Sequence, residues 1–165
     1  MLYTAAMQID NVKAKDFVDV LQLNEDSLPH LSRIDADEVQ WFADNAAYFR
    51  VLRVDERLAG FLIGLRPGTT YASPNYRWFC DNYDDFAYID RVAVADWARR
   101  RGIADSLYKD FAHSQPGVAV MTCEVNIRPP NAGSMRFHER QRFNRIGSQV
   151  IDDGEKEVAY LEKKL

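Results

Sequence analysis

Three consecutive arginines precede a glycine near the middle of the chain, in the order Arg99-Arg100-Arg101-Gly102. The residues before them, Val92-Ala93-Val94, are typical of a strand, and apolar residues recur at four-residue intervals after them, as on a helix. A basic turn between a strand and a helix start favours an anion, because the first helical N–H groups point outward and glycine permits close approach. The junction therefore predicts a phosphate or pyrophosphate site. The alternative is that the three arginines are only a solvated run of charge.

The elements around this junction can be followed along the whole sequence. We expect a short strand over residues 3–9, two amphipathic helices in the first third, and a hairpin of strands 48–54 and 58–65 around Asp55-Glu56-Arg57. Next come a strand over 86–94, a helix over about 100–113, a strand over 118–125, a helix to about residue 141, and a hairpin of 143–151 and 155–162. The middle strand–helix–strand unit should be parallel and right-handed.

Arg66-Pro67-Gly68 ends the hairpin, and the segment Thr69–Asp85 that follows contains Pro74, so we expect it to be a long loop of a functional or mobile kind. Its three aspartates, Asp81, Asp84 and Asp85, have the charge to attract a cation, and its aromatic side chains can enclose an apolar group. The alternative is a solvated acidic loop whose aromatic rings pack inward.

Composition limits the class of protein. The chain has 165 residues, 47% of them apolar and 28% charged, which predicts a single folded α/β domain over 1–165 that needs no metal or disulfide. A net charge of -4 argues against a nucleic-acid binder, and no apolar run approaches the length of a membrane span. Without a secretory leader or a metal-binding spacing, we expect Cys80 and Cys123 to be reduced thiols of a cytoplasmic protein.

Two motifs resemble those of one known family. Arg99-x-x-Gly102-x-Ala104, after a strand ending Val92-Ala93-Val94, is similar to the [Q/R]-x-x-G-x-[G/A] motif of the GNAT superfamily of N-acetyltransferases. Downstream, Asn131-x-x-Ser134-x-x-Phe137-His138-x-x-x-Arg142-Phe143 resembles the family's N-x-x-[A/S]-x-x-[L/F]-Y-x-x-x-G-F. This chain departs from the pattern at His138, where the family has tyrosine, and at Arg142, where it has glycine.

The resemblance implies a fold and a cofactor. The fold would be a mixed, partly split sheet of about six to seven strands flanked by about four helices, and the cofactor acetyl-CoA, released as CoA. The family's binding pattern then assigns the backbone of Val92-Ala93-Val94 to the pantetheine amides, in the manner of an added strand. The segment Arg99-Arg100-Arg101-Gly102-Ile103-Ala104 would hold the pyrophosphate, and Asn131 with Ser134 the pantetheine arm. Asn131 is equally placed to cap the helix that follows it.

The resemblance also suggests which groups move protons. His138 occupies the position from which the family's tyrosine protonates the departing thiolate; alternatively it packs or bonds a backbone carbonyl. Alternation along the strand 86–94 places Tyr88 and Asp90 on one face, and we take Asp90 as the first candidate for the general base and Glu124 as the second. Either carboxylate is as well explained by pairing with an arginine.

These assignments predict an N-acetyltransferase that moves an acetyl or short acyl group to the primary amine of a small molecule, by direct attack in a ternary complex. Tyr88, Tyr83 and Trp78 would line the acceptor site, with no metal involved. The alternatives are an acetyltransferase acting on a protein or peptide amine, and a CoA-binding sensor without turnover. A monomer or homodimer is expected, since strands at the C-terminal sheet edge are able to pair.

Overall fold

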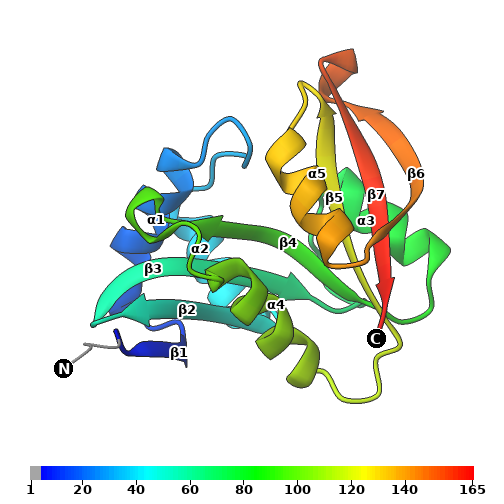
Figure 1. The fold of residues 1–165 in the computed structure, drawn as a ribbon. Helices are drawn as coiled ribbons and strands as arrows, with labels where there is room; N and C mark the ends of the chain where they lie inside the picture. Colours follow the sequence, from blue (N-terminus) through cyan, green and yellow to red (C-terminus); the bar gives the residue numbers. More distant parts are fainter. Residues whose placement is uncertain (1–4) are drawn as a thin grey trace. The chain divides into compact units, whose positions relative to one another are not determined.

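The computed structural model describes residues 5–165. Their helices and strands are, in order, β1 (Met7–Asn11), α1 (Phe17–Asp26), α2 (Ala36–Asn45), β2 (Tyr48–Val54), β3 (Arg57–Leu65), α3 (Pro74–Asn82), β4 (Ala87–Val94), α4 (Ile103–His113), β5 (Val120–Arg128), α5 (Ala132–Arg140), β6 (Asn144–Ile151) and β7 (Lys156–Lys164), with short 3-10 turns at 14–16, 96–98 and 152–154 (Figure 1). Residues 3 and 4 of the first expected strand lie outside the described part of the chain.

The seven described strands form one sheet in the order β1-β2-β3-β4-β5-β7-β6. The described pairs of β4 with β5 are parallel, Ala87 with Met121 and Tyr88 with Thr122, and the outer ladders β1-β2, β2-β3, β5-β7 and β6-β7 are antiparallel. The expected mixed sheet with a parallel strand–helix–strand unit is therefore confirmed, and the short β4-β5 ladder agrees with a partly split sheet. Contacts divide the chain into two compact units, residues up to Gly64 with Arg91–Ser114, and Leu65–Asp90 with Gln115–Leu165. The prediction of a single domain stays a prediction, and each unit is described by itself.

The first unit is built on the hairpin of β2 and β3. Its turn, Asp55-Glu56, has positive φ at both residues (48° and 69°), the geometry that joins antiparallel strands in two residues. Helix α4 lies against β3, in front of it in Figure 1, and the approach is so close that a Cβ on Gly60 would lie 2.8 Å from the Ala93 carbonyl oxygen and 2.9 Å from Ile103. The predicted helix–strand packing thus depends on a glycine in the strand.

Helices α1 and α2 are joined to β4 by a buried arginine. Arg91 is 5% exposed, and its guanidinium donates to the Asn24 side-chain oxygen (2.9 Å) and to the Ser32 carbonyl (3.0 Å). The same group lies 5.7 Å from the centre of the Phe42 ring. Since a buried charge is tolerated only with such hydrogen bonds, Arg91 holds the segment between α1 and α2 against the strand that leads to the basic turn.

The second unit has an aromatic core. Tyr76 and Phe79 from α3, Tyr88 from β4 and Tyr160 from β7 are all 0% exposed. Their rings meet at tilted or edge-to-face angles with centroids 5.1 to 5.6 Å apart for Phe79–Tyr160, Phe79–Tyr88 and Tyr76–Tyr88. Such pairs add to the stability gained by burial alone. They fix α3 against β4 and β7.

Two expectations about the chain's local structure were wrong. Residues 74–82 form a helix within the segment expected to be a loop, because Ser73 caps it by accepting from the Tyr76 N–H and Pro74 occupies its first position. Helix α4 begins at Ile103 rather than near Arg100, since Arg100 and Gly102 both have positive φ (61° and 73°), which ends any helical path through them.

Candidate functional site

The basic turn places a helix N-terminus directly behind a glycine. Gly102 is the residue before the first turn of α4 and adopts the left-handed conformation, with its carbonyl accepting from the Ser106 N–H (2.9 Å). A Cβ at this position would have nothing within 4 Å, so the backbone there borders open space. The N–H groups of Ile103 and Ala104 belong to the first turn, which has no intrahelical acceptor for them. The turn is therefore built to receive an anion on its backbone.

The three arginines of this turn are exposed. Arg99 forms an ion pair with Asp96 (2.9 Å), and the Arg101 guanidinium lies 5.9 Å from the centre of the Trp97 ring. Neither contact buries the charge, and exposed pairs of this kind are weak. The positive charge of the turn thus remains available in solution, both as a solvated run and as an attraction for an anion.

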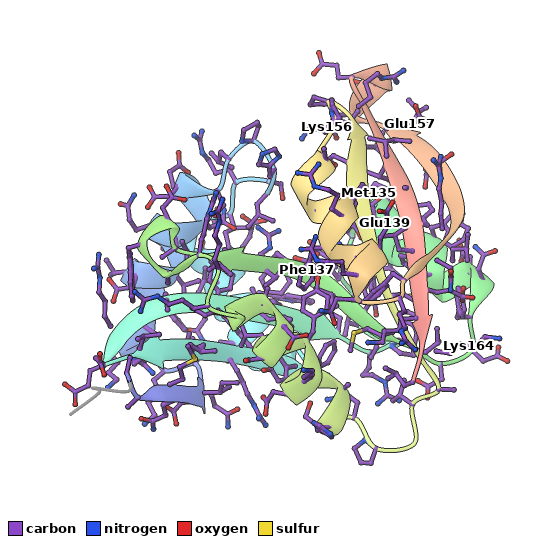
Figure 2. All side chains as sticks on the ribbon, in the orientation of Figure 1. Met135, Phe137, Glu139, Lys156, Glu157 and Lys164 are labelled. Atoms are coloured by element: carbon purple, nitrogen blue, oxygen red, sulfur yellow. The ribbon has the colours of Figure 1, made fainter. Side chains whose placement is uncertain are left out.

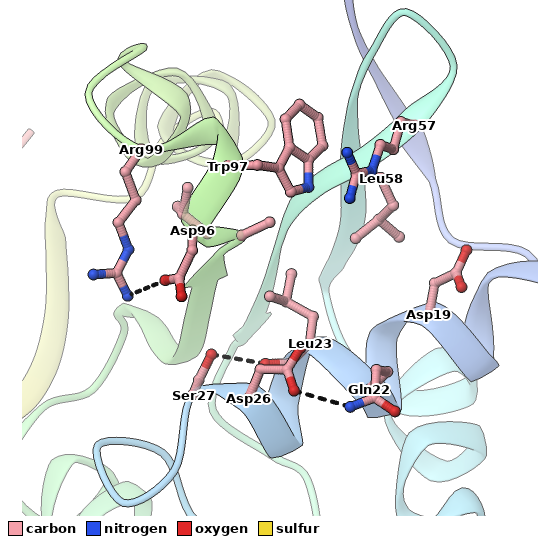
Figure 3. A pocket seen from close by; sticks show the side chains of 12 residues that line it. Asp19, Gln22, Leu23, Asp26, Ser27, Arg57, Leu58, Asp96, Trp97 and Arg99 are labelled. Atoms are coloured by element: carbon pink, nitrogen blue, oxygen red, sulfur yellow. Dashed lines mark hydrogen bonds and ion pairs between the residues drawn. The ribbon is translucent and has the colours of Figure 1, made fainter.

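A cavity of about 520 Å³ adjoins the turn within the first unit. Val94 and Arg99 line it together with the side of α1 that carries Asp19 and Asp26, and Figure 3 shows Arg57 and Trp97 at its rim. The Arg57 guanidinium lies 4.3 Å from the centre of the Trp97 ring, a cation–π contact. No sequence motif pointed to this hollow, because its residues come from three separate elements.

Strand β4 leads into the turn with alternating burial. Ala93 is buried, whereas Val92 and Val94 are half-buried. The N–H of Ala95 donates to the Ala59 carbonyl of β3 (2.8 Å), which fixes the strand end on that side. The three predicted pantetheine-binding residues and the predicted pyrophosphate-binding residues therefore form one continuous strand–turn–helix segment of the first unit.

In the second unit, a carboxylate lies within the aromatic core. Glu124 of β5 is half-buried, and its Oε1 accepts from the Tyr88 hydroxyl (3.0 Å) and from the Asn75 amide nitrogen (3.2 Å). Asn75 is itself 8% exposed, and its side-chain oxygen lies 3.0 Å from the Tyr160 hydroxyl. Both of these donors to Glu124 are neutral groups.

We call Glu124 and the residues around it, Tyr88, Asn75, Tyr160 and Gln149, the Glu124 cluster. Only some of the residues predicted to line the acceptor site contact it. Burial raises the pKa of Tyr88 well above 10.0, and the negative charges of Glu124 and Asp90 act in the same direction, so Tyr88 is a protonated donor. Trp78 stacks on Tyr160 with ring centroids 4.4 Å apart. Tyr83 donates to Glu162 instead, and burial raises its pKa. Tyr88 and Trp78 thus belong to the Glu124 cluster, and Tyr83 has a separate partner.

The acidic residues of the same segment face water. Asp81, Asp84 and Asp85 are exposed, and Asp85 forms a two-oxygen ion pair with Arg66 (2.7 and 2.9 Å). Tyr76 and Phe79 are buried, which is the inward packing stated as the alternative.

Helix α5 carries the remaining predicted residues of the second unit. Asn131 caps it, with its side-chain oxygen accepting from the Ser134 N–H (3.2 Å), so the capping alternative is confirmed. His138 is 4% exposed, and its Nδ1 lies 2.7 Å from the Ser134 carbonyl oxygen; Figure 2 labels its neighbour Phe137, whose ring meets the imidazole edge-on. A carbonyl only accepts, so the neutral ring carries its proton on Nδ1.

The sequence did not indicate three members of this cluster, which are Asn75, Tyr160 and Gln149. They lie 49, 36 and 25 positions from Glu124 along the chain, and nothing in their spacing relates them. A signal existed for Asn75 alone, since it follows Ser73-Pro74 at the start of a helix.

A family model described as the acetyltransferase (GNAT) family matches residues 17–143 of this sequence. The chain belongs to this family. A search among curated proteins found no match. Membership confirms the resemblance seen in the two motifs, makes the chain an N-acetyltransferase, and gives acetyl-CoA as its acyl donor.

Solved structures with the same fold include several acetyltransferases. Ard1 from Thermoplasma volcanium is 18% identical with a TM-score of 0.74 and covers 97% of this chain and 98% of that one. Arabidopsis thaliana NAA60 in complex with a bisubstrate analogue is 17% identical with a TM-score of 0.74, covering 96% and 98%. The ribosomal-protein-S18-alanine N-acetyltransferase from Escherichia coli is 16% identical with a TM-score of 0.68, covering 96% and 94%.

The residues of this GNAT acetyltransferase fit the cofactor that its family implies. The Cβ-free turn at Gly102 borders open space at a helix N-terminus, and three exposed arginines surround it, which suits the diphosphate of CoA. Within residues 5–165, no group of three His, Cys, Asp or Glu side chains is arranged to hold a metal ion. None of the helices there is long and apolar enough to cross a bilayer.

The burial of His138 predicts how the stability of this acetyltransferase depends on pH. Burial lowers the pKa of His138 below its ordinary 6.5, although the hydrogen bond to Ser134 acts in the opposite direction. The unfolded chain then binds the proton more tightly than the folded one, so the stability that this residue contributes is complete above pH 6.5 and is lost as the pH falls toward the folded pKa. The His138→Gln variant should lose less stability than the parent protein between about pH 8 and about pH 5.5. Urea unfolding at both pH values measures this; an equal loss in both proteins contradicts it.

Proposed function

We propose that this chain transfers the acetyl group of acetyl-CoA to the primary amine of a small molecule, by direct attack of the amine on the thioester in a ternary complex. Family membership supports the reaction class. The observation that carries the cofactor assignment is the left-handed Gly102 at the start of α4, with Arg99, Arg100 and Arg101 beside it. We assign the pyrophosphate to the backbone from Arg99 to Ala104.

The remaining cofactor contacts follow from the family pattern. We assign the pantetheine amides to the backbone of Val92-Ala93-Val94, whose outer two residues are half-buried. Asn131 uses its oxygen to cap α5, so its amide nitrogen is the group that would donate to the pantetheine arm. Ser134 would lie along the same arm.

We assign the general base to Glu124. A general base must be ionised and correctly oriented. The two hydrogen bonds to one oxygen of Glu124 orient the carboxylate, and they also favour its charged form. The other candidate for the base, Asp90 of β4, is also half-buried, and the variants described below separate the two carboxylates. The cluster around Glu124 is compact and aromatic, which favours an acceptor whose amine is carried on a small molecule. The thiolate that leaves needs a proton, which would come from water or from the cationic form of His138, the minor form near neutral pH because burial lowers the pKa of His138.

Substitution of Gly102 tests the cofactor assignment. In the Gly102→Val variant, a β-branched residue at φ 73° strains the turn and places a side chain where the diphosphate would lie, so the dissociation constant for CoA should rise about tenfold or more. Gly117→Val is the matched control, since Gly117 also has positive φ (84°) and open space around its Cβ position but does not begin a helix. Isothermal titration measures both. Equal weakening in the two variants would count against the assignment.

A panel of acceptors tests the reaction and its substrate class. Thiol release from acetyl-CoA should be fastest with small primary amines. A terminal amine of a peptide is the second candidate, favoured by the relatives that are named as acetyltransferases of a ribosomal protein or bound to bisubstrate analogues. Faster release with peptides would select that candidate, and tight CoA binding without release for any acceptor would indicate a sensor.

Substitution of the two carboxylates separates the candidate bases. Glu124→Gln keeps an oxygen for Tyr88 and Asn75 but cannot take a proton, so kcat with the best acceptor should fall about 10²- to 10⁴-fold and its rise with pH should disappear. Asp90→Asn should leave kcat within about threefold of the parent value. If the larger loss appears in Asp90→Asn, the base is Asp90.

A further inference from the structure

A chain of polar side chains leads away from Glu124 through the core of the second unit. The Asn75 amide nitrogen donates to Glu124, the Asn75 oxygen faces the Tyr160 hydroxyl at 3.0 Å, and the same hydroxyl lies 2.5 Å from the side-chain oxygen of Gln149 on β6. These residues come from α3, β5, β6 and β7. We propose that Tyr160 and Asn75 are positioning residues of the acetyl-transfer reaction, which hold the carboxylate of Glu124 in its reactive orientation.

The direction of each hydrogen bond follows from the groups involved. The Tyr160 hydroxyl has one proton and faces two acceptor oxygens, that of Asn75 at 3.0 Å and that of Gln149 at 2.5 Å. With its oxygen engaged in this way, the Asn75 amide has only one orientation, the one that turns its nitrogen toward Glu124. Without the Tyr160 hydroxyl, the Asn75 oxygen loses its buried partner, and the Asn75 nitrogen is held less firmly at its 3.2 Å distance from Glu124.

Burial makes this network of hydrogen bonds rigid. Tyr160 is 0% exposed, its ring is stacked on Trp78 and meets Phe79 edge-on at 5.1 Å, and a side chain on Gly147 would lie 3.5 Å from Trp78. The low polarity of such surroundings strengthens the hydrogen bonds among these groups. Burying this network costs free energy, and the network in return holds a carboxylate in place.

The titratable groups that face Glu124 are few. Tyr88 and Tyr160 approach it from β4 and β7, Cys123 precedes it on β5, and Asp90 acts with it on Tyr88. The negative charge of Glu124 helps to raise the pKa of each tyrosine above 10.0, after burial. Near neutral pH the two tyrosine hydroxyls therefore keep their protons and remain hydrogen-bond donors.

The inference rests on the proposed function, because it takes Glu124 to be the base. The test uses Tyr160→Phe, which removes one hydroxyl and keeps the ring stacked on Trp78. We expect kcat to fall about ten- to a hundred-fold with an unchanged KM for acetyl-CoA, and the acid limb of the pH profile to move to higher pH, because a carboxylate that loses a fixed donor is more easily protonated. Asn75→Leu should have a similar effect.

Two further measurements distinguish positioning from a structural role. The double variant Tyr160→Phe with Asn75→Leu should be no slower than Asn75→Leu alone, and Tyr160→Phe should have no effect on kcat once Glu124 is replaced by glutamine. Tyr48→Phe is the matched control, since it also removes a buried hydroxyl bonded to a carboxylate (Asp110, 2.7 Å) but in the first unit, and it should leave kcat and the pH profile unchanged.

The outcomes separate this inference from the function on which it depends. If Glu124→Gln keeps the parent kcat, the assignment of the base fails and the positioning role fails with it. If Glu124→Gln is slow but Tyr160→Phe has the parent kcat and pH profile, the positioning role is overturned and the base assignment stands. A fall in kcat that is equal in Tyr160→Phe and Tyr48→Phe would likewise overturn it.

Discussion

The geometry of the basic turn depends on one backbone conformation, that of Gly102. At φ 73° this residue turns the chain from the end of β4 into the first turn of α4, and it does so without a Cβ that would fill the space in front of the helix. Arg100 also has a positive φ, 61°, so two of three consecutive residues have left-handed backbone conformation. A side chain that tolerates this conformation less well would displace the helix N-terminus relative to the strand, and with it the N–H groups that make the turn attractive to an anion.

The two units solve different chemical problems by different means. In the first unit, the three arginines of the basic turn are exposed, and the backbone of the turn provides the N–H donors for the diphosphate that we assign to it. In the second unit, one carboxylate lies within an aromatic core, and two neutral groups, Tyr88 and Asn75, donate to it. An arginine partner would hold Glu124 ionised more strongly but would also make it a weaker base, because the ion pair would have to be broken for the proton to bind. Tyrosine and asparagine are therefore better suited as partners of a carboxylate in the role of base that we propose for Glu124.

The parts that were predictable from the sequence are those determined by local order. The strand–turn–helix segment around Arg99–Gly102, the Asn131 cap and the two hairpins follow from residues that are near one another in the chain, and the structure has them where the patterns indicated. Helix α3 was missed because its apolar residues are aromatic rings directed at partners in β4 and β7, and those partners are invisible to periodicity. The Glu124 cluster was missed for the same reason, since Asn75 and Tyr160 stand 85 residues apart and meet only through the fold. Family resemblance indicated Glu124 only as a second choice.

His138 stands where the family has tyrosine, and the two side chains differ in where they carry a proton. With Nδ1 donating to the Ser134 carbonyl and the pKa lowered by burial, the imidazole is uncharged near neutral pH and its Nδ1 proton is engaged. A tyrosine at this position would offer a donor instead. The leaving group is a thiolate, which near neutral pH is only slightly more basic than water-exposed cysteine at pKa about 8.5, so it departs with little need of a strong acid. The more demanding proton transfer is the one from the amine, which agrees with our proposal that Glu124, with its two ordered hydrogen bonds, is the base.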